Sequence, residues 1–182
     1  MRKCRFVYSK TGKARYLSHL DTMEVFRRAF SRAGIALKYS EGFNPHPIIS
    51  IVLPCPLGHA SYCELLDVTL ADDFGFSGLC ERLNNALPSG LTVLSANLPI
   101  KKPGDLRYLD IKIELFYDGK TPRLELLDFA GATWSRIDGG YELTLNALPT
   151  KLNPTHIAEA LEPDFWRVTR LQTLDADGAA YR

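Results

Sequence analysis

The sequence lacks the features of a membrane protein and of a structural metal site. None of its 182 residues belongs to a run of about 18 consecutive apolar residues, and its first residues lead into an alternating pattern rather than an apolar signal segment. The cysteines are widely spaced, with no Cys-x-x-Cys pair and no finger-type pairing with histidine. They are Cys4, Cys55, Cys63 and Cys80. We therefore expect a cytoplasmic protein that contacts no membrane, binds no metal and keeps its cysteines as buried free thiols.

The signatures of common enzyme sites are also missing. The sequence has no P-loop, no Rossmann glycine pattern, no Gly-x-Ser-x-Gly and no His-Glu-x-x-His. A self-contained cofactor enzyme is therefore not expected, and the sequence predicts no cofactor. With 46% hydrophobic residues, the chain can bury a core and is long enough for one large domain or two small ones.

The charge is balanced overall but unevenly distributed. The formal net charge is +1. Residues 1–60 carry ten Lys or Arg and three acids, a net charge of +7, whereas residues 61–182 carry twelve and eighteen, a net charge of −6. Such asymmetry is typical of a surface that faces a polyanion, but compact proteins also have uneven faces, and the sequence leaves both interpretations open.

The first half of the chain predicts the order strand, helix, strand, strand, helix, strand. Ser18 is a good N-cap with Asp21 three residues later, which places the start of the first helix, and Gly34 ends it. The predicted strands are 4–10, 35–40, 62–70 and 91–98, with 48–53 as a continuation of the second, and the helices are 18–33 and 76–87. This β-α-β-β-α-β order is that of a ferredoxin-like fold.

The second half repeats the pattern less clearly. After a linker at 99–106 we expect a strand at 107–116, a helix near 123–129, a hairpin and a helix that opens at Asn153-Pro154. The hairpin arms are 132–137 and 141–147, joined at Asp138-Gly139, and a last strand at 166–174 precedes a loose tail at 175–182. The prediction is an α+β protein of two tandem ferredoxin-like halves, residues 1–98 and 107–182, the second degenerate.

A first candidate site is a phosphate-binding surface. Arginine grips phosphate through paired hydrogen bonds, and nearby aromatic rings stack on bases. The candidate cations are Lys10, Lys13, Arg15, Arg28 and Arg32, with Tyr39 and Phe43 as stacking residues. The alternative is a solvated helix face on which Glu24 pairs with Arg28, and the aromatic-rich strand of an RNA-recognition motif is absent.

A second candidate combines His19, Asp21 and His46. Two imidazoles and a carboxylate are able to bind a metal, and His19 is able to act as a general base on a ribose hydroxyl. Sequence alone does not bring His46 to His19, and a structural histidine at a helix start explains His19 equally well. We therefore expect no metal site and no catalytic residue, with His19 as the alternative.

A third candidate is the segment Gly42-Phe43-Asn44-Pro45-His46-Pro47. Proline restricts the backbone and glycine allows positive φ, so the segment predicts a loop of preset shape. Such a loop suits binding, with Asn44 and His46 making polar contacts, because little ordering entropy is lost. A rigid connection between strands is the alternative.

Together these motifs resemble the radical-SAM-linked family of uncharacterised bacterial proteins. The similarity lies in Lys10-Thr11-Gly12, Ser18-His19-Leu20-Asp21, an Arg-x-x-x-Arg-Ala-Gly pattern and Ser40-Glu41-Gly42-Phe43-Asn44-Pro45-His46-Pro47. It is dense over residues 10–58 and thin after about residue 100. The resemblance implies a radical SAM protein as partner and a role near RNA or ribosome metabolism. Because this chain lacks the three-cysteine cluster motif of a radical SAM enzyme, such chemistry would come from the partner.

The sequence thus leads to an accessory or substrate-adaptor protein for a radical SAM enzyme, which binds RNA through a basic face of its N-terminal half. Two alternatives remain open. One is a metal-independent endoribonuclease that uses His19, and the other is a protein-interaction module for the radical SAM partner.

Overall fold

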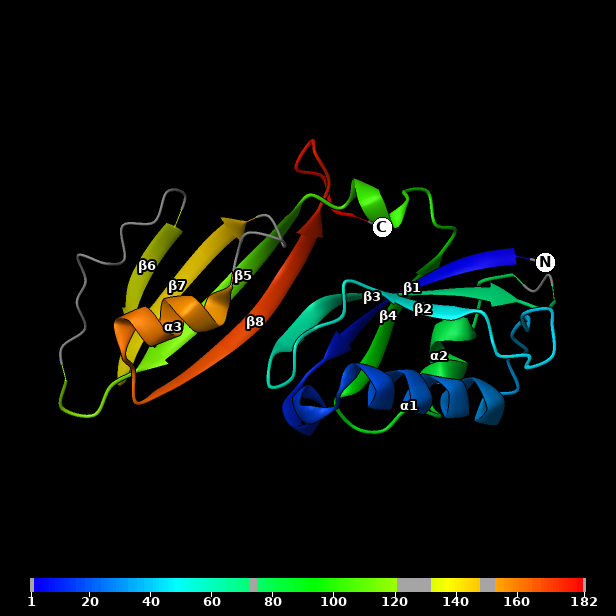
Figure 1. Cartoon of the computed structure of the whole chain (residues 1–182), viewed down its shortest axis with the longest axis horizontal. Helices are drawn as coiled ribbons and strands as arrows, with labels where there is room; N and C mark the ends of the chain where they lie inside the picture. Colours follow the sequence, from blue (N-terminus) through cyan, green and yellow to red (C-terminus); the bar gives the residue numbers. More distant parts are fainter. Residues whose placement is uncertain (1, 73–74, 121–131, 148–152, 182) are drawn as a thin grey trace. The chain divides into compact units, whose positions relative to one another are not determined.

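The computed structural model describes residues 2–72, 75–120, 132–147 and 153–181. The chain divides into two units, Met1–Pro103 (unit 1) and Gly104–Tyr181 (unit 2). The division lies inside the segment 99–106 that the sequence marks as a linker. Each unit has antiparallel strands and at least one helix, so the mixed α+β class predicted from the sequence is confirmed (Figure 1).

The strands and α-helices of unit 1 follow one another in the predicted order. Its elements are β1 (Arg2–Lys10), the 3-10 helix η1 (Gly12–Tyr16), α1 (His19–Arg32), β2 (Ile49–Val52), β3 (Ala60–Leu70), α2 (Leu79–Asn84) and β4 (Leu91–Asn97). The strands pair in the order β4-β1-β3-β2, and every pair is antiparallel. The two α-helices lie on the same side of this sheet (Figure 1).

The core of unit 1 lies between the sheet and these helices. Side chains alternate along a strand, so Cys4, Phe6 and Tyr8 of β1 all point toward the helices and are buried. The ring of Phe6 packs on Phe30 of α1 at 5.6 Å between centroids, and Tyr8 packs on Phe26 at 4.8 Å. Each fully buried aromatic or aliphatic side chain contributes about 1.5 to 3 kcal/mol. The same alternation directs Lys3 and Arg5 to the opposite, helix-free face.

The second strand is shorter and later than predicted. The segment 35–40 forms only isolated bridges, Leu37 to Leu70 and Tyr39 to Pro47, and the regular strand β2 begins at Ile49. Proline supplies no backbone N–H, so Pro45 and Pro47 prevent a continuous ladder from 35 to 53. The chain between α1 and β2 is therefore a long connection with a hairpin-like loop in its middle.

Unit 2 has its own antiparallel strands. Its elements are β5 (Tyr108–Phe116), β6 (Ala132–Ile137), β7 (Gly140–Ala147), α3 (Pro154–Leu161) and β8 (Phe165–Leu174), and η2 (Pro103–Asp105) lies at the boundary between the units. The order is β8-β5-β7-β6. The predicted hairpin is confirmed, with Gly139 at φ 72° in its turn, and Asn153 caps α3 through the N–H of Thr155. The helix predicted near 123–129 lies outside the described residues.

The prediction of a loose tail at 175–182 is wrong for residues 175–181. The Asp175 carboxylate accepts hydrogen bonds from the N–H groups of Asp177 and Ala179, both at 2.9 Å, and Tyr181 donates its N–H to Thr173. The Tyr181 side chain is buried. An aspartate that bonds its own following backbone makes a turn, and this turn folds the tail back on β8.

The helices that the structure describes are short. The longest, α1, has 14 residues. In this described part of the chain, no helix has the length and apolar character needed to cross a membrane.

Candidate functional site

Residues 39–47, here called the GFNPHP loop, form a closed and self-supporting structure. Tyr39 bridges to Pro47, and the N–H of Ser40 donates to the carbonyl of His46 at 2.8 Å. The Ser40 hydroxyl accepts the N–H of His46 at 3.1 Å and lies 3.0 Å from its Nδ1. When the hydroxyl donates to Nδ1, the neutral imidazole carries its proton on Nε2. The loop therefore has a preset shape, and Gly42, at φ 122°, supplies a conformation that other residues rarely adopt.

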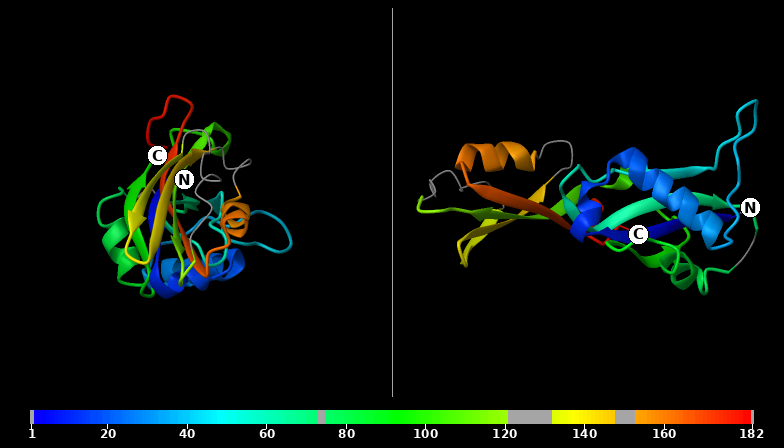
Figure 2. Two further views of the ribbon diagram at one scale, coloured as in Figure 1. Left: turned by 90° about the vertical axis from the view of Figure 1, so that its left-hand side faces the viewer. Right: turned by 90° about the horizontal axis from the view of Figure 1, so that it is seen from below.

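The loop displays aromatic side chains to solvent. Phe43 is fully exposed, Tyr39 is 55% exposed and Asn44 is also exposed. Figure 2 shows the loop projecting away from the sheet and helices of unit 1. Exposing a large apolar ring to water is unfavourable. An exposed ring on a loop of preset shape is therefore typical of an interaction site.

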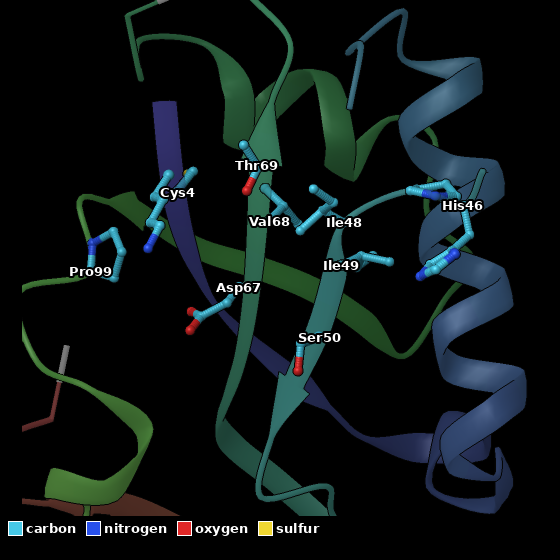
Figure 3. Close-up of a pocket in the computed structure, with 11 residues that line it drawn as sticks. Cys4, His46, Ile48, Ile49, Ser50, Asp67, Val68, Thr69 and Pro99 are labelled. Atoms are coloured by element: carbon cyan, nitrogen blue, oxygen red, sulfur yellow. The ribbon is translucent and has the colours of Figure 1, made fainter. Parts of the chain in front are cut away.

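A pocket of about 310 Å³ lies beside the loop on unit 1. Its polar side chains come from the N-terminus, the loop and two neighbouring strands, and Pro99 closes it from the chain that follows β4 (Figure 3). The lining residues with polar side chains are Lys3, His46, Ser50, Asp67 and Thr69. Because His46 belongs both to the loop and to the pocket lining, the two features form one continuous site.

Strand register explains why these polar groups meet. Asp67 of β3 lies opposite Arg5 of β1 on one side and opposite Ser50 of β2 on the other, and Thr69 lies opposite Lys3. Directly opposed residues point to the same face of a sheet. The pocket floor is therefore the helix-free face of unit 1 near the Leu70 end of β3.

An ion pair holds the Asp67 carboxylate in place. Arg5 donates from Nε to Oδ1 at 2.6 Å and from its second nitrogen to Oδ2 at 2.7 Å. Arg5 is 1% exposed, whereas the Asp67 side chain keeps 26% of its surface exposed. Arg5 also donates to the carbonyl of Lys101 at 3.0 Å. The carboxylate is thus neutralised and oriented, and it keeps oxygen lone pairs that are able to accept further hydrogen bonds.

Cys4 contributes to the pocket lining but not to chemistry. Burial raises the pKa of its thiol to about 12. The thiolate is the reactive form, so this group is inert near neutral pH. The expected buried free thiols are found at Cys4, Cys55 and Cys63, while Cys80 is half-buried.

Lys10 is not available to bind phosphate at the surface, which corrects one predicted contact. It is 2% exposed, and its Nζ donates to the carbonyl of Leu17 at 2.8 Å. The register of β1 shifts between Tyr8 and Lys10, so simple alternation does not predict where this side chain points. The ammonium instead supports the turn that carries η1.

The remaining predicted cations do not converge on the loop. Gly58, just before β3, donates its N–H to the carbonyl of Arg15, which places η1 with Lys13 and Arg15 at the Ala60 end of β3. The GFNPHP loop emerges at the other end, where Leu37 bridges to Leu70. Eleven residues of strand span about 35 Å. The structure therefore does not bring Lys13 and Arg15 together with Phe43 and His46.

The two arginines of α1 have contacts of their own. Arg28 donates to Glu24 at 2.8 Å, the pairing weighed as the alternative from the sequence, although its side chain is 70% exposed. Arg32, at the end of α1, donates to the carbonyl of Ala86 at 2.7 Å. Both keep further N–H donors, since a guanidinium has five.

His19 and His46 are not brought together either. Ser18 and Asp21 form a complete capping box, in which Ser18 Oγ accepts from the N–H of Asp21 at 3.1 Å. His19 follows this cap, at the end of α1 next to η1, and is exposed. Within the described residues no group of three His, Cys, Asp or Glu is placed to hold a metal ion. The Ser-His-Leu-Asp motif thus has a structural explanation in helix capping.

An ion pair in unit 2 connects two strands rather than forming part of the candidate site. Asp164 accepts from the N–H of Asp118 at 2.8 Å and from Lys120 at 2.7 Å. These bonds lower the pKa of Asp164, and the same pairing raises the pKa of Lys120. They join the end of β5 to the residue before β8, on a solvent-exposed turn.

Sequence reasoning missed most of the pocket. Lys3, Ser50, Asp67, Thr69 and Pro99 were not candidates, because they lie in ordinary strands and a linker. One signal was present: Arg5 and Asp67 are charged residues within strands, each flanked on both sides by apolar residues, which is costly unless they pair. Identifying the partner required the register between strands 62 residues apart.

Comparison with known proteins assigns the chain to a family without assigning a biochemical activity. The model of the family described as "Uncharacterized protein conserved in bacteria" matches residues 3–109, more than half of the chain. The matched region contains the loop and the pocket. A search of curated proteins found no match.

Proposed function

The chain belongs to the DUF2344 family of bacterial proteins, and from the geometry of the matched region we propose that it is a non-catalytic adaptor that binds single-stranded RNA. The contact surface is the GFNPHP loop with the adjoining pocket. The single observation that carries the proposal is the fully exposed Phe43 on a loop closed by its own hydrogen bonds.

The side chains of the loop match the chemistry of an unpaired nucleotide. Bases stack on aromatic rings with about 1 to 3 kcal/mol per base, which suits Phe43 and Tyr39. Asn44 and the imidazole of His46 supply polar contacts to base edges or ribose. Lys38, whose backbone pairs with Ile48 at the base of the loop, and Lys3 in the pocket supply charge for phosphates.

The basic residues along α1 and η1 act as a second contact in this proposal. Arg32, Arg28, Arg15 and Lys13 are at least partly accessible and follow one another toward the Ala60 end of β3. A strand of about 12 nucleotides is long enough to reach from the loop toward η1, whereas one of about 4 nucleotides is not.

The partner in the proposal is a radical SAM enzyme, as implied by the resemblance of residues 10–58. That segment contains the exposed loop, and the chain itself lacks the cluster motif. The adaptor would present RNA, and the partner would supply the chemistry. A pull-down of the partner that survives ribonuclease treatment, without any RNA binding, would favour a pure protein-interaction module instead.

We also propose that both units are ferredoxin-like. The strand orders β4-β1-β3-β2 and β8-β5-β7-β6 support this, because each places the fourth and third strands of its unit on either side of the first. Proteins with such folds include many RNA binders, which is an analogy of fold only.

The direct test measures binding of a fluorescent single strand of about 12 nucleotides to the full chain and to Phe43→Ala. We expect affinity to fall at least tenfold, about 1.4 kcal/mol, because one stacking contact is lost. Leu57→Ala is the control, since Leu57 is 64% exposed but precedes Gly58 at the opposite end of β3. Equal binding by Phe43→Ala and wild type would contradict the proposal. RNA cleavage that disappears in His19→Ala would favour the endoribonuclease.

A further inference from the structure

We propose that the pocket beside the GFNPHP loop holds one nucleobase and prefers a base that carries an exocyclic amino group. The inference rests on the proposed function and extends it, because it names the part of the ligand that enters and a specificity. Its basis is the lining of this cavity, in which the carboxylate oriented by Arg5 lies among hydroxyl-bearing and apolar residues.

The size and walls of the pocket suit a small planar ring. Its volume, about 310 Å³, lies at the lower end of the range of about 300 to 1,000 Å³ for ligand pockets. Pro47 is among the apolar lining residues. Ile48 and Pro99 also contribute apolar surface (Figure 3). Bases taken out of a stack are held between apolar or aromatic side chains, so these residues are suitable walls.

The floor of the pocket provides directional hydrogen bonding. Asp67 is an acceptor only, and Arg5 fixes its orientation through both oxygens. Ser50 and Thr69 flank it in register on β2 and β3, and their hydroxyls donate or accept. Lys3, opposite Thr69 on β1, remains available for the phosphate of the same nucleotide. A nucleobase edge, which presents donors and acceptors side by side, matches such a mixture.

Asp67 sets the expected specificity. Its carboxylate, paired with Arg5, accepts hydrogen bonds and does not donate them. Cytosine, adenine and guanine carry an amino group that donates two hydrogen bonds, whereas uracil has a carbonyl in the position of the cytosine amino group. A uracil carbonyl placed against the carboxylate leaves two acceptors facing each other, so uracil meets Asp67 only through its single N3–H, which disfavours it relative to a base with an amino group.

The position of the pocket agrees with a strand that also contacts the loop. His46 lines the pocket and is held to Ser40 inside the loop. A strand with one base on Phe43 and another in the pocket would therefore pass His46. The same nucleobase chemistry could come from RNA or from a free nucleotide, and the experiment separates these two sources.

The experiment titrates cytidine monophosphate and uridine monophosphate into the isotope-labelled 182-residue chain and follows backbone amides by NMR. We expect cytidine monophosphate to shift the amides of Ser50, Asp67 and Thr69, and uridine monophosphate to do so at least tenfold more weakly. The comparison uses wild-type protein, so it does not depend on a variant that folds. Absence of shifts with either nucleotide overturns the inference, and equal affinities overturn the specificity.

A matched pair of variants then tests the RNA-bound form. Ser50→Phe places a ring in the pocket floor, whereas Thr92→Phe makes the same type of change at an exposed position on β4, at the far edge of the sheet. With labelled cytidine-rich single strands, Ser50→Phe should lower affinity at least tenfold, and Thr92→Phe should bind as wild type.

The two arms separate failure of the inference from failure of the proposed function. RNA binding that depends on Phe43 but is unchanged in Ser50→Phe overturns the pocket inference and leaves the RNA adaptor in place. Nucleotide shifts without any RNA binding overturn the adaptor and assign the pocket to a free nucleotide.

Discussion

At the scale of single residues, the Arg5–Asp67 pair has two roles. It neutralises two charges on the helix-free face of unit 1, and it orients an acceptor in the pocket. Such pairs are costly to break from one side, because the remaining charge stays in a poorly solvated place. Arg5, which is almost fully buried, is therefore the partner that cannot be left without its carboxylate.

Replacing Asp67 with alanine should lower the free energy of unfolding by about 3 kcal/mol, near the lower end for buried pairs because Asp67 is partly exposed. Urea denaturation of the full chain measures this. Glu24→Ala removes an exposed pairing with Arg28 and should cost less than about 1 kcal/mol. The double change Arg5→Met with Asp67→Leu should be milder than Asp67→Ala alone. Similar costs for Asp67→Ala and Glu24→Ala would contradict this account.

At the scale of elements, the Ser-His-Leu-Asp segment resembles a functional motif in the sequence but serves to cap a helix in the structure. Ser18 and Asp21 satisfy each other's backbone N–H groups and fix the start of α1. Of the four residues, His19 and Leu20 take no part in this cap. The motif thus positions the helix that covers the core, through Phe26 and Phe30.

Ser18→Ala should destabilise the protein by about 1 kcal/mol, the usual cost of a lost N-cap, and leave RNA affinity unchanged. Thermal unfolding and the RNA titration provide the two readouts. Ser31→Ala, an exposed change near the other end of α1, should have little effect on stability. A loss of RNA affinity in Ser18→Ala with unchanged stability would instead assign the motif to the binding surface.

The elements also show what could be predicted from the sequence. Alternation in β1 and the cap and periodicity of α1 were readable, because these are local properties. The burial of Lys10 was not, since it follows a register shift and a contact with Leu17. The separation of Lys13 from Phe43 was not readable either, because it depends on the length of β3, an element that lies later in the chain. Closeness in sequence had suggested one surface where the structure has two.

At the scale of the whole molecule, the low net charge of +1 makes binding depend on a few local cations rather than on a general field. The proposed interface offers Lys3 and Lys38 near the loop, with further cations along α1. The affinity for short RNA should therefore be only moderately sensitive to salt, and the affinity for longer RNA more so.

With strands of about 4 nucleotides, Lys3→Ala should reduce the slope of log affinity against log salt concentration by about 0.7, the value for one phosphate contact on a single strand. Lys13→Ala should leave that slope unchanged. With strands of about 12 nucleotides, both variants should reduce it. A slope for the short strand that depends on Lys13 but not on Lys3 would move the primary contact to η1.

Arg5 also donates a hydrogen bond to the carbonyl of Lys101, two residues before the end of unit 1. One guanidinium thus tethers the pocket's acceptor and the backbone that leads into unit 2. A ligand that donates to Asp67 shares this carboxylate with the guanidinium of Arg5. Because linkage is reciprocal, a displacement of the connecting backbone that moves Arg5 should also change the affinity for the ligand.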